Sequence, residues 1–413
     1  MDESNNCQKS VKMSVLIPDA EDWLTLKVLR CLGQESIFKN HILSKMKIPI
    51  SRFCRYCTSY HFNKSQNDDE WIEEINKLIT KLQINVILPI TVEGFELISR
   101  NRAKISKSVR IPALPEPEKI VLTNDKWAFY KFLCQHDLPS VPTVYAGNSG
   151  EDINLHEINS IEFPALLKPL SENGGAGFLK IEKAGDLEQA WHDVRILKNQ
   201  DYILQSYIPA DHLALSIYSR EGKILAYTLY QSLLQPNPYR IGELMEFKND
   251  DKIIEIGSKL ISDLKWNGVA NIDFLVDKRD KSVTILEFNP RFWQSVLGSF
   301  NAGVNFPSLW CFDTMGVKTS FDLRQSVNFA SPKGYLRILF KRLKGKEVST
   351  KIRLKESALK FTLSDPLPEI IDSIQKVKSK IINTKLFRFF SHEKNNNDNV
   401  CLKKANEKHF ECN

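Results

Sequence analysis

Three polar side chains stand two residues apart at the end of an apolar stretch, in the segment TILEFNPRFW at residues 284–293. They are Glu287, Asn289 and Arg291. Residues two apart in a strand share one face, so we expect these three side chains to converge. The apolar stretch VANIDFLVD upstream carries Asp273, and pairing of the two strands in a hairpin would set that carboxylate beside Glu287.

Two carboxylates and an amide oxygen at close range suit a hard divalent cation. Mg²⁺ takes oxygen ligands, usually a few from the protein and the rest from phosphates and water. The guanidinium of Arg291 adds a fixed fork of donors that matches a phosphate group. The alternative is a structural cluster in which Arg291 neutralises Asp273 and Glu287. Such ion-pair networks are common, and these residues alone favour neither interpretation.

A lysine and a glycine-rich segment form a second candidate site. Lys168 closes the apolar stretch PALLK, and the following SENGGAGF contains Gly174, Gly175 and Gly177. Glycines let backbone N–H groups approach phosphate oxygens because no Cβ stands in the way. The segment is not a Walker A loop, since no Gly-Lys-Ser/Thr follows, and not a dinucleotide-binding fingerprint, since a strand comes next. Taken alone, it is also compatible with an ordinary hairpin tip.

The elements that must position these residues follow two patterns. Before residue 120, the strand-like stretches MSVLIPDA and NVILPI alternate with the helically spaced DWLTLKVLRCLGQ, WIEEINKLITKL and VEGFELISR, which is typical of a parallel α/β layer. The proline-rich PALPEPEKI predicts a linker. After it we expect a helix with a Thr/Asn cap that ends at Pro139, then a hairpin with the glycine-rich segment at its tip, then antiparallel strands.

With the lysine, the glycine-rich hairpin and the carboxylate–amide–arginine strand in this order, the sequence resembles the ATP-grasp ligases. The likeness is to the branch that contains biotin carboxylase, carbamoyl-phosphate synthase and the carboxylate–amine ligases, and EFNPRFW and KPLSENGGAG are its most specific motifs. The resemblance implies an α/β and α+β fold. The expected parts are an N-terminal parallel α/β (pre-ATP-grasp) domain at 1–120, an ATP-grasp small subdomain at 121–204, a large subdomain with the metal site at 205–325, and a basic helical extension at 326–413.

The resemblance also implies roles for individual residues. Arg291 and Lys168 are the catalytic residues that stabilise the transferred phosphoryl group, and the segment LQSYI is the hinge that meets the adenine. The implied nucleotide-binding residues are Lys126, Lys168, Gly174, Gly175, Gly177, Gln205, Ser206, Tyr207, Ile208 and Asp211. The implied metal ligands are Asp273, Glu287 and Asn289.

Some positions depart from the family pattern. Gln205 stands where the hinge commonly opens with Glu, although an amide oxygen can still accept from the adenine amino group. After the hinge, Asp211 is the expected ribose contact, while His212 follows it and Ser216 stands where Asp is frequent. Tyr239 and Arg240 follow a predicted strand on the side expected to face substrate, and a surface arginine is the equal alternative.

The implied reaction is carboxylate activation. ATP transfers its γ-phosphoryl group to a carboxylate, an amine attacks the acyl-phosphate, and ADP and phosphate are released. ATP and two Mg²⁺ ions, with Mn²⁺ as an alternative, are the implied cofactors. The other activities considered are an ATP-grasp carboxylase, a kinase-like phosphotransferase and a nucleotide-binding regulator without turnover. Small-molecule carboxylate and amine substrates are expected, and a homodimer is compatible with the sequence.

Charge is distributed unevenly over the 413 residues. The net charge is +7, but residues 331–413 carry 19 Lys/Arg against 9 Asp/Glu, so the rest of the chain is mildly acidic and nucleic-acid binding is not expected. Helical spacing of Ile370, Ile374, Val377 and Ile381 beside several lysines predicts a basic amphipathic helix. It could contact a membrane surface or a partner, or pack on the main body. The residues from about 392 onward are expected to be disordered.

The cysteines and the N-terminus bear on the compartment. Eight scattered cysteines and a polar, acidic start without a signal-peptide pattern predict a cytoplasmic, reduced protein. Cys54 and Cys57 have CxxC spacing, but His61 is the only nearby histidine and no second cysteine pair is evident. Ordinary thiols are therefore the favoured interpretation.

Overall fold

The computed structural model describes most of the chain. It describes residues 12–378 apart from 22, 66, 150–157, 159, 171–177, 196–199, 235–241, 322, 324–325 and 346–349. Residues up to Ser364 belong to one compact unit, and Asp365 begins a second. The described part of the second unit contains a helix at 367–378, which matches the first half of the expected basic helix. No helix in the described ranges is long and apolar enough to cross a membrane.

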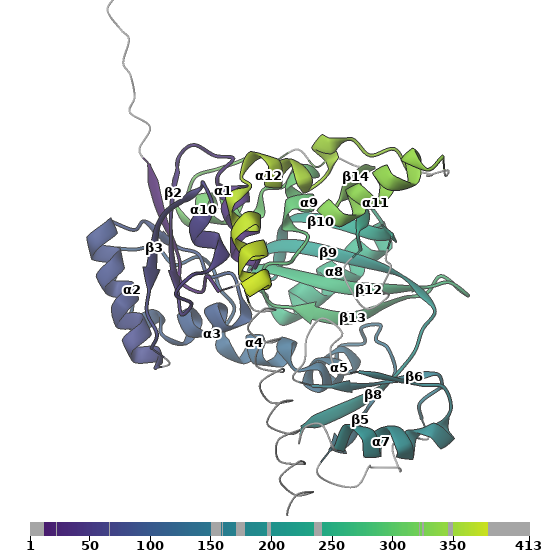
Figure 1. Ribbon diagram of the computed structural model, residues 1–413. Coiled ribbons are helices and arrows are strands. Elements are labelled where there is room, and N and C mark those ends of the chain that lie inside the picture. Colours follow the sequence, from purple (N-terminus) through teal and green to yellow (C-terminus); the bar gives the residue numbers. More distant parts are fainter. Residues whose placement is uncertain are drawn as a thin grey trace, which may run out of the picture. The chain divides into compact units, whose positions relative to one another are not determined.

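The N-terminal part is a parallel sheet with helices, as expected (Figure 1). Its strand order is β3-β2-β1-β4. The strands are β1 (Met13–Ile17), β2 (Phe38–Ser44), β3 (Cys57–Phe62) and β4 (Val86–Ile87). The helices are α1 (Trp23–Leu32), α2 (Asp68–Leu82) and α3 (Val92–Arg100), with short 3-10 turns η1 (Ile50–Phe53) and η2 (Arg102–Lys104). β1 is buried throughout, as its continuous apolar sequence predicts.

The next part is a small antiparallel sheet of order β5-β8-β6-β7. Its strands are β5 (Thr143–Asn148), β6 (Ala165–Pro169), β7 (Leu179–Ile181) and β8 (Asp201–Ser206). The helices of this part are α4 (Pro117–Asn124), α5 (Lys126–Gln135) and α7 (Leu187–Arg195), with the turn η3 (Ala184–Asp186). β6 and β7 pair antiparallel, which confirms the expected hairpin, while the glycine-rich segment between them lies outside the described residues.

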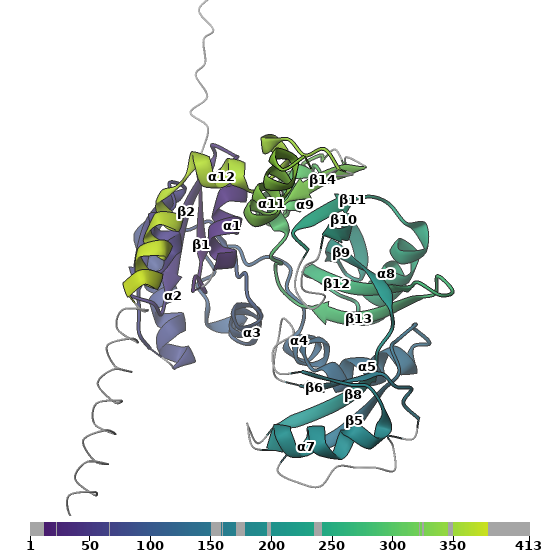
Figure 2. The same ribbon diagram turned by 45° about the vertical axis from the view of Figure 1, so that its right-hand side comes forward.

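The third part is a six-stranded antiparallel sheet of order β13-β12-β9-β10-β11-β14 (Figure 2). Its strands are β9 (Ala210–Arg220), β10 (Lys223–Leu234), β11 (Leu244–Phe247), β12 (Gly268–Asp277), β13 (Val283–Asn289) and β14 (Val327–Ala330). The helices are α8 (Asp251–Leu264), α9 (Val296–Asn301), α10 (Phe306–Thr314), α11 (Pro332–Leu343) and α12 (Leu359–Ser364), with the turn η4 (Leu354–Glu356). β14 thus supplies an edge strand from the sequence segment expected to be an extension.

Two details near residue 120 differ from the sequence-based expectation. The proline-rich segment is not extended throughout, because α4 begins at Pro117, a first-turn position where the missing N–H costs nothing. The helix expected to start with a Thr/Asn cap instead starts after Asp125, whose carboxylate accepts from the Ala128 N–H at 2.7 Å. Lys126 is therefore the first residue of α5.

The N-terminal sheet is joined directly to the segment that follows β13. The Phe292 N–H donates to the Ile90 carbonyl at 3.2 Å. Lys27 of α1 donates to the side-chain and backbone oxygens of Gln294 at 2.6 and 2.7 Å. These bonds fix the end of the EFNPRFW motif against the N-terminal part of the molecule.

Candidate functional site

The hairpin of β12 and β13 brings the two predicted acidic ligands together. Asp273 and Glu287 are direct partners in the antiparallel register, so their side chains project from the same face. Asn289 donates to Asp273 Oδ2 at 2.9 Å, and Asn271 donates to Asp273 Oδ1 at 3.0 Å. The oxygen of Asn271 in turn accepts from Ser216 at 2.9 Å. The site therefore holds two neighbouring carboxylates, and two amides set the orientation of Asp273.

Burial and a second carboxylate act together on the pKa of Asp273. Burial and the adjacent Glu287 raise the pKa of Asp273 to about 7, although hydrogen bonds from Asn271 and Asn289 and the charge of Arg291 act in the opposite direction. Two carboxylates with too little nearby positive charge form an arrangement that a divalent cation would stabilise.

Arg291 lies beside this pair but is held by neutral oxygens. Its guanidinium donates to Asn289 Oδ1 at 3.2 Å and to the Phe292 carbonyl at 2.9 Å. Among the residues that the structure describes, no ion pair within 4.0 Å joins Arg291 to Asp273 or Glu287. The arrangement therefore differs from a cluster closed by direct Arg–carboxylate contacts.

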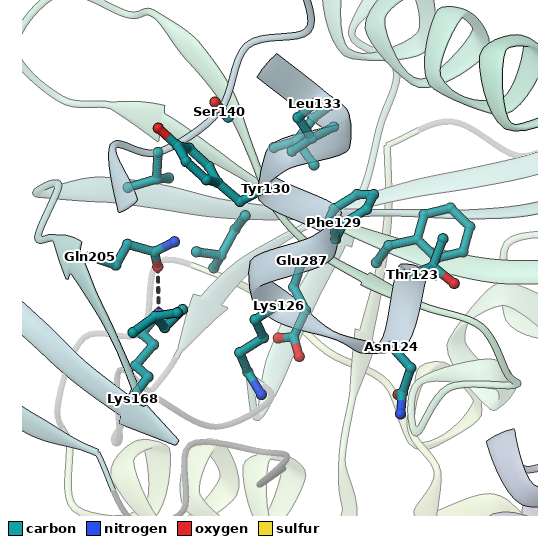
Figure 3. A pocket seen from close by; sticks show the side chains of 15 residues that line it. Thr123, Asn124, Lys126, Phe129, Tyr130, Leu133, Ser140, Lys168, Gln205 and Glu287 are labelled. Carbon is teal, nitrogen blue, oxygen red and sulfur yellow. Dashed lines mark hydrogen bonds between the residues drawn. The ribbon is translucent and has the colours of Figure 1, made fainter. Parts of the chain in front are cut away.

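A cavity between the small sheet and the β12–β13 hairpin gathers the predicted lysines (Figure 3). Lys126, Lys168, Gln205 and Glu287 all line it. The Lys168 ammonium donates to Gln205 Oε1 at 2.6 Å, and Lys126 donates to the Leu170 carbonyl at 3.1 Å. Two cations and a carboxylate therefore face one cavity, as a phosphate–metal site requires.

The surroundings of Lys168 lower the pKa of its ammonium group. Burial lowers its pKa to about 8, and the charge of Lys126 acts in the same direction, while Glu287 raises it. Its hydrogen-bond acceptor, Gln205, carries no charge. The amide of Gln205 is itself oriented by donation to Thr143 Oγ1 at 2.9 Å.

The walls of the cavity are apolar residues that the sequence did not single out. Phe129 and Leu133 come from α5, Ile203 from β8 and Ile285 from β13. Residues of this kind are abundant in helices and strands, so their types and spacing gave no distinct signal. Together they give the cavity an apolar wall, as is usual for small-molecule sites.

The predicted hinge residues divide between two hollows. Gln205 lines the cavity of Lys168, whereas Ser206, Tyr207 and Ile208 line a second hollow beside Phe163. The Ser206 N–H donates to the Pro142 carbonyl at 3.0 Å and the Tyr207 N–H to the Pro164 carbonyl at 2.8 Å. A bound base would therefore have to use groups other than these two N–H donors, or displace their partners.

The remaining predicted residues lie at different places. Asp211, near the start of β9, is 3.5 Å from the ammonium of Lys278, and its neighbour His212 has a pKa lowered by burial and by Lys168. Ser216 supports Asn271 as described above. The other predicted residues, namely Gly174, Gly175, Gly177, Tyr239 and Arg240, lie outside the described residues.

The CxxC segment forms no metal centre in the part of the chain that is described. Cys54 is buried and Cys57 half-buried, both as free thiols, and burial raises the pKa of Cys57 to about 12. His61 bonds Ser59 Oγ at 2.8 Å. No group of three or more His, Cys, Asp or Glu side chains among the described residues could hold a metal ion.

The comparisons with known proteins agree with this architecture. A putative urea carboxylase of Emericella nidulans is 23% identical over 225 residues, which cover 48% of this chain and only 18% of that protein. The structure resembles an N5-carboxyaminoimidazole synthetase of Staphylococcus aureus bound to ADP, with 14% identity, a TM-score of 0.63 and coverage of 81% of this chain and 87% of that one. It also resembles the biotin carboxylase domain dimer of the Hydrogenobacter thermophilus 2-oxoglutarate carboxylase, bound to MgADP, ADP and bicarbonate. Here the identity is 15%, the TM-score 0.59, and the coverage 76% of this chain and 73% of that one.

A family model gives the most direct assignment. The model of the ATP-grasp domain matches residues 123–295, a range that begins just before Lys126 and ends just after the EFNPRFW motif. The match contains the cavity lysines, Gln205 and the carboxylate pair of the β12–β13 hairpin. The fold expected from the resemblance is confirmed by the similar structures, and the match over residues 123–295 agrees with the expected ATP-grasp family.

Proposed function

We propose that this chain is an ATP-dependent ligase that activates a carboxylate as an acyl-phosphate and joins it to an amine. The observation that carries the proposal is the Asp273–Glu287 pair, set face to face beside a cavity that holds Lys126 and Lys168. The ATP-grasp domain match supports it. The similar structures named above were solved with ADP or MgADP, which also fits a nucleotide in this cavity.

The donor set fits magnesium. Asp273, Glu287 and Asn289 would hold the ion, because they offer two carboxylates and an amide oxygen on one sheet face. Burial and the neighbouring Glu287 both raise the pKa of Asp273, and a bound cation would favour its charged form. When bound, the ion neutralises phosphate oxygens and fixes their position.

The side chains of the chain then act by position and charge. The ammonium of Lys168 binds a terminal phosphate oxygen, and Arg291, held by Asn289 and the Phe292 carbonyl, faces the same group. The substrate carboxylate oxygen bonds to the γ-phosphorus as the bond to ADP breaks. An amine then forms the C–N bond, phosphate leaves with the C–O electron pair, and the proton that the amine loses passes to the phosphate or to solvent.

A carboxylase is the second candidate. The distant relative from Emericella nidulans is named as a urea carboxylase, and one similar structure is a biotin carboxylase domain with bicarbonate. Bicarbonate would then be the activated carboxylate, with the same use of Lys168 and the acidic pair. The two candidates differ in the substrate and not in the phosphoryl-transfer site.

Assembly, compartment and domain limits are part of the proposal. We infer a homodimer, in line with the dimeric biotin carboxylase domain, and a cytoplasmic location, in line with the free thiols found among the described cysteines. The basic C-terminal helix would contact a membrane surface or a protein. The proposed domain boundaries remain at 120, 204 and 325.

The metal assignment is tested by Glu287→Gln, which keeps the shape of the side chain and removes its charge. ADP release should fall by a factor on the order of 10³ or more, while the folded state and much of the ATP affinity remain. Asp280→Asn, at the turn end of the same hairpin, is the matched control and should leave turnover unchanged. Unchanged ADP release in Glu287→Gln would refute the assignment.

The substrate is tested by ADP release from the purified chain with Mg²⁺ and ATP. Pools of amino acids, dipeptides, small carboxylic acids and bicarbonate should be supplied alone and together with amines. ADP that appears only with a carboxylate–amine pair supports the ligase. ADP that appears only with bicarbonate and an acceptor supports the carboxylase, and ADP with a carboxylate alone indicates a kinase-like transfer.

A further inference from the structure

Helix α11 exposes an apolar stripe on the side opposite to its buried face. Leu336, Leu339, Phe340 and Leu343 are 46%, 40%, 63% and 75% exposed, whereas Ile338 is 3% exposed. At 3.6 residues per turn, the four exposed side chains cover roughly 100° of the helix surface, centred away from Ile338. We call these four residues the α11 stripe. A solvent-facing helix normally shows polar residues there, so the stripe indicates an interaction surface.

The helix is held firmly beneath the stripe. Tyr335 and Ile338 pack with Leu244, Ala330 and Ile352 in a small core of their own. Ser331 caps the first turn by accepting from the Gly334 N–H at 3.0 Å. The stripe is therefore presented by a fixed element of the large-sheet part, and it differs from the basic helix at 367–378.

The charged residues of the helix itself all have one sign. Residues 332–345 contain no Asp or Glu, and their exposed basic side chains are Lys333, Arg337, Lys341, Arg342 and Lys344. On the helix surface, Lys333 and Lys344 lie at one border of the stripe. Long basic side chains at such a border can extend toward lipid headgroups while their stems cover apolar surface. Arg337 is also paired with Glu243 at 2.8 Å.

We propose that α11 docks on an anionic membrane surface, with the stripe among the lipid chains at the interface and the lysines at the phosphates. An amphipathic helix with a basic border has the composition of an interfacial helix, and it lies on a bilayer without crossing it. A second copy of the chain is disfavoured as the occupant, because two facing stripes would bring together the border lysines of both copies, Lys333 and Lys344. The tail at 379–413 is disfavoured for the same reason, since it carries seven Lys/Arg against four Asp/Glu.

The test is co-sedimentation of the full chain with unilamellar vesicles. One set is phosphatidylcholine alone, and the other contains about one third phosphatidylglycerol, so that the surface is anionic. The wild type should bind the anionic vesicles and not the neutral ones, and salt should weaken the binding. The double variant Leu336→Ser/Phe340→Ser should bind at least about tenfold more weakly, because two large apolar side chains no longer enter the interface. Lys333→Gln/Lys344→Gln should also weaken binding to the anionic vesicles.

The controls separate this surface from the others. Leu225→Ser removes a leucine of similar exposure, 42%, from β10 and should bind as the wild type does. Thermal unfolding of every variant checks that it is folded. Absence of binding to anionic vesicles, equal binding to neutral ones, or binding by Leu336→Ser/Phe340→Ser equal to that of the wild type would each overturn the proposal. So would a wild-type dimer that Leu336→Ser/Phe340→Ser converts to a monomer, since a second copy would then cover the stripe.

Discussion

Replacing Gln205 with glutamate should change how the affinity for ATP depends on pH. Gln205 Oε1 accepts from the Lys168 ammonium at 2.6 Å, so the substitution puts a negative charge at hydrogen-bond distance from a cation that now has a neutral partner. If Lys168 binds phosphate as proposed, its charged form is the one that binds ATP. The pH at which Lys168 loses its proton then sets the pH at which affinity declines.

The expected size follows from the position of this titration. The pKa of Lys168 is lowered from 10.5 to about 8 by burial. At pH 9, only about one tenth of the free protein would keep Lys168 charged, so wild-type ATP affinity should fall about tenfold between pH 7 and pH 9. In Gln205→Glu, the new carboxylate raises the pKa of Lys168 toward its ordinary value, and affinity should stay nearly constant to pH 9.

The substitution also has a structural cost. The Gln205 amide donates to Thr143 Oγ1 at 2.9 Å, and Thr143 donates its own hydroxyl to the Val141 carbonyl at 2.8 Å. A carboxylate cannot donate, so the Thr143 hydroxyl must turn toward it and leave the Val141 carbonyl. We expect a loss of about 1 kcal/mol in the free energy of unfolding.

The assay is titration of ATP binding at several pH values between 7 and 9.5. Gln205→Met is the opposing control, because it removes the oxygen that accepts from the Lys168 ammonium. The pKa of Lys168 should then be lower still, and the affinity for ATP should decline at a lower pH than in the wild type. A wild-type affinity that stays constant from pH 7 to 9.5 would refute the reasoning. An affinity for ATP that declines at the same pH in the wild type and in both variants would also refute it.

Two further predictions concern stability. Lys168→Met should stabilise the ATP-free protein by about 2 kcal/mol at pH 7, allowing for the partial exposure of the side chain. Because the pKa of Lys168 is lowered on folding, the unfolded chain binds more protons between about pH 8 and 10.5. The wild type therefore gains stability as pH rises, and the difference in free energy of unfolding between Lys168→Met and the wild type shrinks in that window. A difference that stays constant or grows with pH would contradict this. Gly94→Ala should destabilise the protein by about 1–3 kcal/mol, because its Cβ would lie 2.0 Å from Asp19 Oδ2, which is held by the Ile90 and Thr91 N–H groups. Gly185→Ala, which meets no atom within 4 Å, is the matched control in the same thermal unfolding assay.

The parts of the site that follow strand periodicity could be predicted from the sequence. The two-residue spacing of Glu287 and Asn289 requires only a strand, and the apolar stretch around Asp273 requires only a partner in a hairpin. The structure sets Asp273 directly opposite Glu287, as expected. Two of the four strands before residue 120, β1 and β4, were likewise visible as apolar stretches that alternate with helical ones, which is why a parallel layer was predicted.

The parts that depend on contacts between distant segments could not be predicted. β2 and β3 carry polar residues such as Asn40, His41 and Ser59 and lack a continuous apolar run, so they were missed. The placement of the hinge residues in two different hollows could not be predicted either. Gln205 and Ser206 are adjacent in sequence, but they line different hollows because successive strand residues point to opposite faces. The resemblance to the family places both residues in one site, whereas the alternation of side chains along the strand places them on opposite faces.

The apolar half of the EFNPRFW motif explains how the polar half keeps its position. Phe288 is buried against Trp266 and Phe129, with ring centroids 4.7 and 5.8 Å apart. Phe292 packs on Trp310 at 5.7 Å, and its N–H is bound to the carbonyl of Ile90, which follows β4 in the N-terminal part. Because alternate residues face opposite ways, rings packed in the core on one side fix the backbone from which Glu287 and Asn289 project on the other. The aromatic residues therefore position the carboxylate pair, and the buried aromatic face of this strand is as much a part of the site as its polar face.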